Sequence, residues 1–220
     1  MADLKDKLLD AALLHVPFDG WTEASFDAAL ADSGIDPALA HGLCPRGAAD
    51  LAVAYHERGD ARMLERLRQA DLSELKFRDR VSAAVRYRLE VVEDKELVRR
   101  GMTLFALPAY APDGARLMWN TCDLIWRELG DTSEDLNWYT KRATLSGVYS
   151  STVLYWLGDA SEGNAATWEF LDRRIENVMQ FEKVKAGLRG NKLLGGFIDK
   201  VTEAVRAPQG AKDMPGHTNK

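Results

Sequence analysis

The chain contains 220 residues, of which 46% are hydrophobic and 29% are charged. This length suffices for one domain with a substantial core and is too short to argue for two. The net charge of −5 excludes a general attraction to nucleic acid or to anionic membranes, so any such attraction must be local. No window approaches the roughly 18 uninterrupted apolar residues of a membrane-spanning helix, and the first residues lack the pattern of a secretory signal. These features predict a cytoplasmic protein.

Residues 1–60 predict a head that resembles a helix-turn-helix. After a first helix, Thr22 is placed to cap a second helix that stops at Gly34. Pro37 then begins a short helix that ends at Gly42, because proline is tolerated in a first helical turn. This layout, followed by a large helical remainder, is the plan of TetR-type regulators, in which a DNA-binding head precedes a ligand-binding body.

The predicted head lacks the side chains that bind DNA. Its second short helix reads Pro37-Ala-Leu-Ala-His41, without the Arg, Lys, Asn or Gln that read base edges. Residues 1–58 contain ten acids and four bases, a local net charge of −6 that would repel a phosphate backbone. We therefore expect no nucleic-acid partner. A TetR-type transcription regulator with a hydrophobic ligand is the alternative interpretation.

Residues 61–190 predict a helical body. A polar connection at 130–135 precedes a helix that begins near Asn137, and no segment shows the alternation of a strand. The fold class predicted is all-α, a TetR-like bundle of about nine to ten helices with a vestigial helix-turn-helix. Helical spacing of apolar residues marks three helices through Phe77, Val81, Val85 and Leu89, through Met118, Cys122, Ile125 and Leu129, and through Trp168, Leu171, Ile175 and Val178.

Catalytic and metal-binding motifs are absent from the sequence. It contains no GxGxxG, GxxxxGK[ST] or GxSxG, and none of its four histidines follows a Glu at the spacing that di-iron bundles use. His41 and Cys44 have no second pair of ligands nearby. Cys44 and Cys122 lack a CxxC spacing and are interpreted as two separate buried thiols in a reducing compartment. We expect a protein that is not an enzyme and holds no metal.

Aromatic residues gather in the run from Trp126 to Arg142. Trp138 and Tyr139 are adjacent near a helix start, so both rings cannot point in the same direction into one core. An exposed large aromatic residue usually marks an interface. The alternative is that both rings pack against the preceding loop.

The spacing W-x3-GD-x-S-x-D-x-NWYT-[KR]-R in this run, with Gly20-Trp21-Thr22 and Leu107-Pro108-x3-Pro112, resembles the COQ9 family of ubiquinone-biosynthesis accessory proteins. The likeness runs from about Leu8 to Val205. It implies a TetR-like fold that no longer binds DNA, binds isoprenoid lipids or quinones without another cofactor, and presents them to demethoxyubiquinone hydroxylase. It also implies that the surface patch meeting the hydroxylase includes Leu107, Pro108, Trp138, Tyr139 and Arg142. This chain has Ala109-Tyr110 where a His-Asn pair often follows Leu-Pro, and a homodimer is expected from the fold alone.

The helix expected over residues 137–157 carries a stripe of small residues, Ala143, Gly147 and Ser150. Such a stripe either lets helices approach closely or leaves an apolar void. Large flexible apolar residues nearby favour a void that suits a prenyl chain. The lipid-binding residues predicted on this basis are Met102, Phe105, Met118, Trp119, Gly147, Tyr149, Ser150 and Trp156.

An amphipathic helix is predicted over residues 191–206, before a disordered tail at 207–220. Residues 183–206 contain six bases and two acids, so a membrane interface could bind this segment with its apolar face down. The alternative is a helix packed on its own domain or on a second subunit. Peripheral association with the inner (cytoplasmic) membrane is expected, through Leu193, Leu194, Phe197, Ile198, Val201 and Val205.

Overall fold

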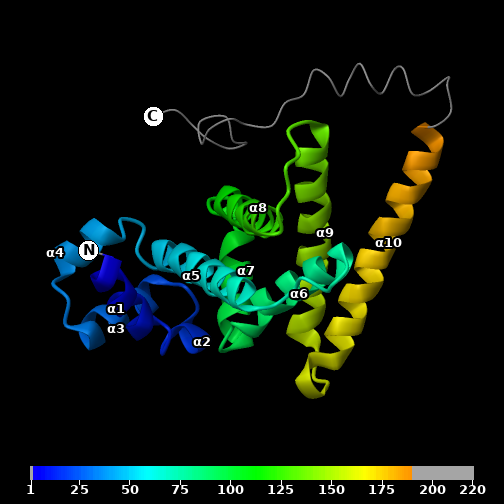
Figure 1. Ribbon diagram of the computed structural model, residues 1–220. Coiled ribbons are helices and arrows are strands. Elements are labelled where there is room, and N and C mark those ends of the chain that lie inside the picture. The colour runs from blue at the N-terminus through cyan, green and yellow to red at the C-terminus, as the bar shows by residue number, and fades with distance from the viewer. Residues whose placement is uncertain (1, 190–220) are drawn as a thin grey trace. The chain divides into compact units, whose positions relative to one another are not determined.

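The computed structural model describes residues 2–189, and within that range it contains ten α-helices and no strand (Figure 1). The all-α prediction is confirmed. Among these residues no helix is both long and apolar enough to cross a bilayer. The helices are α1 (Ala2–Ala12), α2 (Val16–Asp19), α3 (Glu23–Ser33), α4 (Pro37–Leu43), α5 (Ala48–Gln69), α6 (Phe77–Glu90), α7 (Lys95–Phe105), α8 (Ala111–Glu128), α9 (Leu136–Gly158) and α10 (Ala165–Arg189), with a 3-10 turn, η1 (Glu162–Asn164), before α10.

The helix-turn-helix layout of the head is present, and local sequence explains its boundaries. The hydroxyl of Thr22 accepts a hydrogen bond from the Ser25 N–H, while the Ser25 hydroxyl accepts one from the Thr22 N–H, so the two residues form a capping box at the start of α3. Gly34 ends α3 in the left-handed conformation, with φ of 62°. Asp36 caps α4 by accepting a hydrogen bond from the Leu39 N–H at 3.1 Å.

The chain divides into two compact units, each described here by itself. The first contains the residues up to Arg66 and Glu90–Leu117, and the second contains Leu67–Leu89 and the described residues from Met118 onward. In the first unit, the Trp21 indole N–H donates a hydrogen bond to the Leu97 carbonyl at 3.3 Å, and Arg100 donates one to the Pro17 carbonyl at 3.1 Å. These bonds attach α7 to the head helices. The division of the sequence near residue 60 stays a prediction.

The connection between α7 and α8 is short, and α8 already begins at Ala111. Pro112 lies in the first turn of α8, where its missing N–H costs no hydrogen bond. Gly114 has a packing role in this turn. A Cβ atom at this position would lie 2.8 Å from the Phe105 Cβ, so glycine permits the close approach of α7 and α8.

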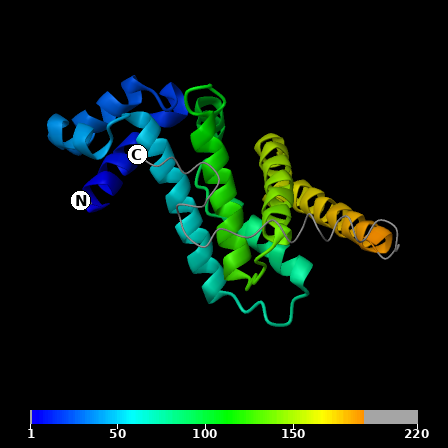
Figure 2. The same cartoon turned by 90° about the horizontal axis from the view of Figure 1, so that it is seen from above.

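The second unit is built from α6, the greater part of α8, α9 and α10. Helices α9 and α10 pack together and converge at η1, and both views show them separating toward the N-terminal end of α9 (Figures 1 and 2). Asp135 caps α9 by accepting a hydrogen bond from the Asn137 N–H at 2.8 Å. The polar connection at 130–135 and the helix start near Asn137 are therefore as predicted.

Cys44 and Cys122 are buried thiols in different units.

Candidate functional site

A cavity of about 260 Å³ lies in the second unit, where α9 and α10 separate. Its walls come from α6, α8, α9 and α10. Most of the lining side chains are apolar, and the remainder are neutral polar groups and two cations. The lining residues are Phe77, Arg78, Val81, Trp126, Asn137, Thr140, Lys141, Thr144, Leu145, Val148, Ile175 and Val178. Such a lining is typical of a site for a largely apolar ligand that a few polar groups orient.

A second hollow of about 380 Å³ adjoins this cavity. The two share Thr144, Val148 and Val178 as lining residues. The second hollow is also lined by Gly147, Ser151, Arg174 and Asn177, so it is more polar and runs further along α9 and α10. The two hollows therefore lie next to each other along α9 and α10.

Both cations of the first cavity are already paired. Lys141 Nζ lies 2.7 Å from a carboxylate oxygen of Asp131 and donates a hydrogen bond to the Ser133 hydroxyl at 2.6 Å. Arg78 forms ion pairs with Asp79 at 3.1 Å and with Glu176 at 3.0 Å. Since these charges are neutralised by the protein itself, the cavity offers little electrostatic attraction to an anion.

Two stacked aromatic rings form one part of the lining. The Phe77 and Trp126 ring centroids are 5.6 Å apart, and their planes are inclined by 27°. The Trp126 indole N–H donates a hydrogen bond to the Lys141 carbonyl at 3.2 Å, which fixes the indole against α9. Phe77 is 47% exposed and is the first residue of α6. The indole is thus held in place, whereas the phenyl ring is only partly covered.

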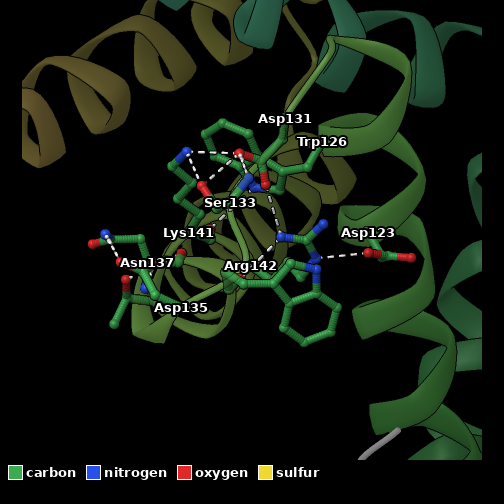
Figure 3. Close-up of polar contacts among 10 residues, drawn as sticks. Asp123, Trp126, Asp131, Ser133, Asp135, Asn137, Lys141 and Arg142 are labelled. Atoms are coloured by element: carbon green, nitrogen blue, oxygen red, sulfur yellow. Dashed lines mark hydrogen bonds and ion pairs between the residues drawn. The ribbon is translucent and has the colours of Figure 1, made fainter. Parts of the chain in front are cut away.

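A buried ion network lies beside the cavity and joins α8, α9 and the connection between them. Arg142 lies between Asp123 and Asp131 (Figure 3), donating from Nε to Asp123 at 2.6 Å and from Nη1 to Asp131 at 3.0 Å. Nη1 also donates to the Trp138 carbonyl at 3.0 Å. Burial alone would raise the pKa of Asp131, but hydrogen bonds from Lys141, Ser133 and Arg142 outweigh it and lower the pKa to about 2. The network therefore fixes the connection at 130–135 against α9.

The adjacent aromatic residues Trp138 and Tyr139 of the NWYT segment differ in burial. Trp138 is buried, and its ring lies 4.8 Å from the Tyr139 ring and 5.8 Å from the Trp119 ring, measured between centroids. Tyr139 is half-buried and also contacts Trp119, at 6.4 Å. The three rings form one cluster, of which Trp138 is the covered member.

The family model described as COQ9 matches residues 111–182, which contain α8, α9 and most of α10. The chain is also similar to ubiquinone biosynthesis proteins. It is 35% identical to COQ9 of Drosophila melanogaster, over 85% of this chain and 59% of the relative. It is 30% identical to the probable coq9 protein of Dictyostelium discoideum, over 83% and 62%, and 33% identical to COQ9 of Xenopus tropicalis, over 80% and 58%. The predicted resemblance to the COQ9 family is confirmed.

The chain spans about three fifths of the length of these COQ9 relatives. All three are named as mitochondrial proteins. The expectation of a cytoplasmic protein on the inner (cytoplasmic) membrane is therefore wrong. That expectation rests on the missing secretory pattern and the missing membrane-spanning run, and neither of these distinguishes compartments inside a cell.

The solved structures include a close match in fold. The TetR transcriptional regulator of Nitrosomonas europaea ATCC 19718 superimposes with a TM-score of 0.65 over 79% of this chain and 97% of the regulator. The two sequences are 18% identical, so the match shows the fold alone. The predicted TetR-like fold is confirmed.

The residues predicted to bind lipid in this COQ9-like chain do not gather around the 260 Å³ cavity. Met102 and Phe105 belong to the first unit, and Phe105 packs against Gly114. None of Met118, Trp119, Tyr149, Ser150 and Trp156 lines the cavity, whereas Gly147 lines the adjoining hollow.

The small-residue stripe does not surround an enclosed apolar void. Ala143 and Gly147 are exposed, and a Cβ atom built on Gly147 meets nothing within 4 Å, so Gly147 only borders the open second hollow. The interpretation of the stripe as the wall of an internal void is wrong, because the helix turns its Thr140, Thr144 and Val148 face toward the first cavity. One turn of a helix places residues four apart on a common face, but the sequence alone does not say which face is covered.

The residues predicted to contact a COQ9 partner differ in accessibility. Leu107 is 50% exposed and Pro108 is exposed, both in the first unit. In the second unit Tyr139 is half-buried, whereas Trp138 and Arg142 are only 6% and 1% exposed. The expectation that the Trp138 and Arg142 side chains lie in a surface patch is wrong, because Asp123 and Asp131 hold the Arg142 guanidinium inside and the Trp138 ring packs against Arg142 and Trp119. Partner binding itself stays a prediction.

The six residues predicted to bind a membrane, from Leu193 to Val205, lie outside the described residues, as does the tail expected at 207–220.

Several residues that line the 260 Å³ cavity stand out in the sequence only as members of apolar helix stripes. Phe77, Val81 and Ile175 each belong to a predicted amphipathic helix, and Val178 ends one. The sequence contains no signal for a cavity at these residues. Hydrophobic periodicity shows which face of a helix is buried, but not where two buried faces move apart and leave a cavity between them.

Proposed function

We propose that this chain is a non-catalytic accessory protein of ubiquinone biosynthesis. It binds an isoprenoid or quinone lipid and presents it to demethoxyubiquinone hydroxylase. The observation that carries the proposal is the apolar cavity between α9 and α10. Both helices lie largely within the segment that matches the COQ9 model, and the relatives that match this chain are named for ubiquinone biosynthesis.

The composition of the cavity lining supports binding over catalysis. General acid–base catalysis requires a His, a carboxyl group or a similar proton donor within hydrogen-bond reach of the reacting atoms. The lining consists of apolar side chains, two threonines, one asparagine and two cations that are already paired. Such a surface holds and orients an apolar molecule, and the reaction belongs to the partner enzyme.

Presentation requires a contact with the hydroxylase. The accessible candidates are Leu107 and Pro108 in the first unit and Tyr139 in the second. The basic C-terminal segment is proposed to bind the membrane in which the lipid dissolves, and self-association is proposed from the TetR-like fold. The acidic head opposes the alternative of a DNA-binding regulator, because phosphate neutralisation supplies most of the affinity in such complexes.

The lipid content of the purified full-length chain tests the proposal. We expect organic extraction and mass spectrometry to recover isoprenoid lipids or quinones when the chain is purified from cells that synthesise ubiquinone. Val148→Trp places a large ring in the cavity and should reduce the recovered lipid severalfold. Leu154→Trp, on the exposed side of the same helix, should not. Circular dichroism establishes that both variants fold.

Equal lipid recovery from both variants would show that the lipid lies elsewhere. A wild-type protein that contains no isoprenoid compound would contradict the proposal as a whole.

A further inference from the structure

The first cavity alone is too small for a lipid with a long tail. Pockets that bury a drug-sized ligand usually measure about 300–1,000 Å³, whereas this cavity measures about 260 Å³. An apolar cavity of about 150 Å³ already accommodates benzene. The cavity therefore has room for one substituted ring and the beginning of a tail. The adjoining hollow, which shares Thr144, Val148 and Val178 with it, provides the continuation.

The two hollows differ in the chemistry they offer. The first contains the Phe77–Trp126 stack, two threonine hydroxyls and two cations that carboxylates already neutralise. Arg174 lines the second hollow, 5.2 Å from the Phe170 ring centroid. An anionic headgroup would meet the guanidinium of Arg174. A flat uncharged ring would meet an aromatic surface and the Thr144 hydroxyl in the first cavity, since the Thr140 hydroxyl already donates to the Asn137 carbonyl at 3.3 Å.

The Phe77–Trp126 stack is suited to admit such a ring. The indole is fixed by its hydrogen bond to the Lys141 carbonyl, whereas Phe77 is almost half exposed at the first residue of α6. Moving the phenyl ring breaks no side-chain hydrogen bond, and aromatic rings stack favourably with centroids roughly 4.5–7 Å apart. An entering ring can therefore contact both side chains at little cost to the fold.

We infer that Phe77 and Trp126 form a subsite for an uncharged aromatic or quinone ring, with the isoprenoid tail passing Leu145 and Val148 toward Gly147. The inference rests on the proposed function and deepens it. It assigns the orientation of the ligand and makes Phe77 a specificity-determining residue. The ring end of the lipid is held in the first cavity, and the tail follows α9 and α10 into the second hollow.

Three soluble probes test this assignment with isothermal titration calorimetry on the full-length chain. The probes are ubiquinone with a single isoprenoid unit, farnesol as a tail without a ring, and farnesyl diphosphate as a charged tail. Phe77→Leu should weaken binding of the quinone by roughly two- to twelvefold, the range typical of one aromatic contact. Its affinity for farnesol should change less than twofold.

The control variant is Phe170→Leu. Phe170 also belongs to an aromatic stack in the second unit, with Tyr155 at 4.5 Å, but it does not line the first cavity. This variant should bind the quinone as the wild type does. Farnesyl diphosphate should bind the wild type no more than a few times more tightly than farnesol, because the cations of the first cavity are paired and Arg174 of the second hollow is exposed to solvent, which screens its charge.

The outcomes separate the two proposals. Equal weakening of quinone and farnesol in Phe77→Leu, or no weakening of the quinone, would overturn the ring subsite while leaving lipid binding intact. A diphosphate that binds at least tenfold more tightly than farnesol would overturn the uncharged headgroup. Failure of the wild type to bind either the quinone or farnesol would contradict lipid binding itself, and the subsite with it.

Discussion

The guanidinium carbon of Arg142 lies 4.0 Å from the centroid of the Trp138 ring, and both side chains are buried. One planar cation thus contacts an indole face and donates hydrogen bonds to the carboxylates of Asp123 and Asp131. Arginine suits this position because its planar group stacks on a ring and binds carboxylates with fixed geometry. The orientation of the Trp138 ring depends on this cation. The NWYT segment therefore contributes to the stability of the fold as well as to the surface.

Replacing Arg142 should destabilise the fold strongly. Removal of one partner from a buried ion pair costs about 3–5 kcal/mol, because it leaves uncompensated charge inside. We expect Arg142→Met to lower the free energy of unfolding by about that amount in urea titrations. Arg127 also pairs with Asp123, at 2.9 Å, but its side chain is largely exposed. Arg127→Met should therefore cost about 1 kcal/mol or less. Similar losses in the two variants would contradict the central role of Arg142.

The ion network should make stability depend on acid pH through Asp131. Its folded-state pKa of about 2 is below its ordinary value of 3.8, so the ionised form stabilises the folded chain. This contribution is complete above roughly pH 5 and is lost as the pH falls toward 2. It amounts to roughly 2 kcal/mol. Unfolding titrations at pH 7, 4 and 3 should show a smaller acid loss in Asp131→Asn than in the wild type.

The control for this pH dependence is Glu134→Gln, an exposed carboxylate in the same connection. It should lose stability with acid as the wild type does. If Asp131→Asn and the wild type lost equal stability between pH 7 and 3, Asp131 would not be the group responsible.

Two glycine substitutions should act in opposite directions. Gly114→Ala places a Cβ atom 2.8 Å from the Phe105 Cβ, and such overpacking typically costs about 1–3 kcal/mol. Gly147→Ala meets no atom within 4 Å and replaces a glycine inside α9, so it should stabilise the chain by up to about 1 kcal/mol. Thermal unfolding measures both. A destabilised Gly147→Ala would indicate that the small stripe packs against something in the free chain.

Exposed contact residues should affect partner binding without affecting stability. Leu107→Ser changes a half-exposed side chain, so unfolding should shift by less than about 0.5 kcal/mol. Co-purification with the hydroxylase should fall severalfold if Leu107 contacts it. Leu39→Ser, on an exposed side chain of the head, is the control. Trp138→Ala is unsuitable for this purpose, because removal of a buried aromatic ring costs about 3–5 kcal/mol and lowers binding through the fold.

The fold was largely predictable because its signals are local. Thr22, Gly34 and Asp36 each set a helix boundary through neighbours within a few residues, and the structure places the boundaries there. The site was less predictable. Arg142 is a charged residue in a polar segment, and its burial depends on Asp123 from another helix, 19 positions earlier. The cavity depends on the separation of α9 and α10, which no local pattern encodes. The stripe of small residues, Ala143, Gly147 and Ser150, was misleading because the sequence does not show which face of α9 borders a cavity.

Helix α6 supplies Phe77 and Val81 to the cavity, although the segment that matches the COQ9 model begins only at residue 111. The lining residues from Trp126 to Val178 lie inside that segment. A protein can therefore match the family model in full and still differ at the α6 wall of the cavity. If the cavity binds a lipid as proposed, substitutions at Phe77 and Val81 will change its ligand preference without changing the match to the model.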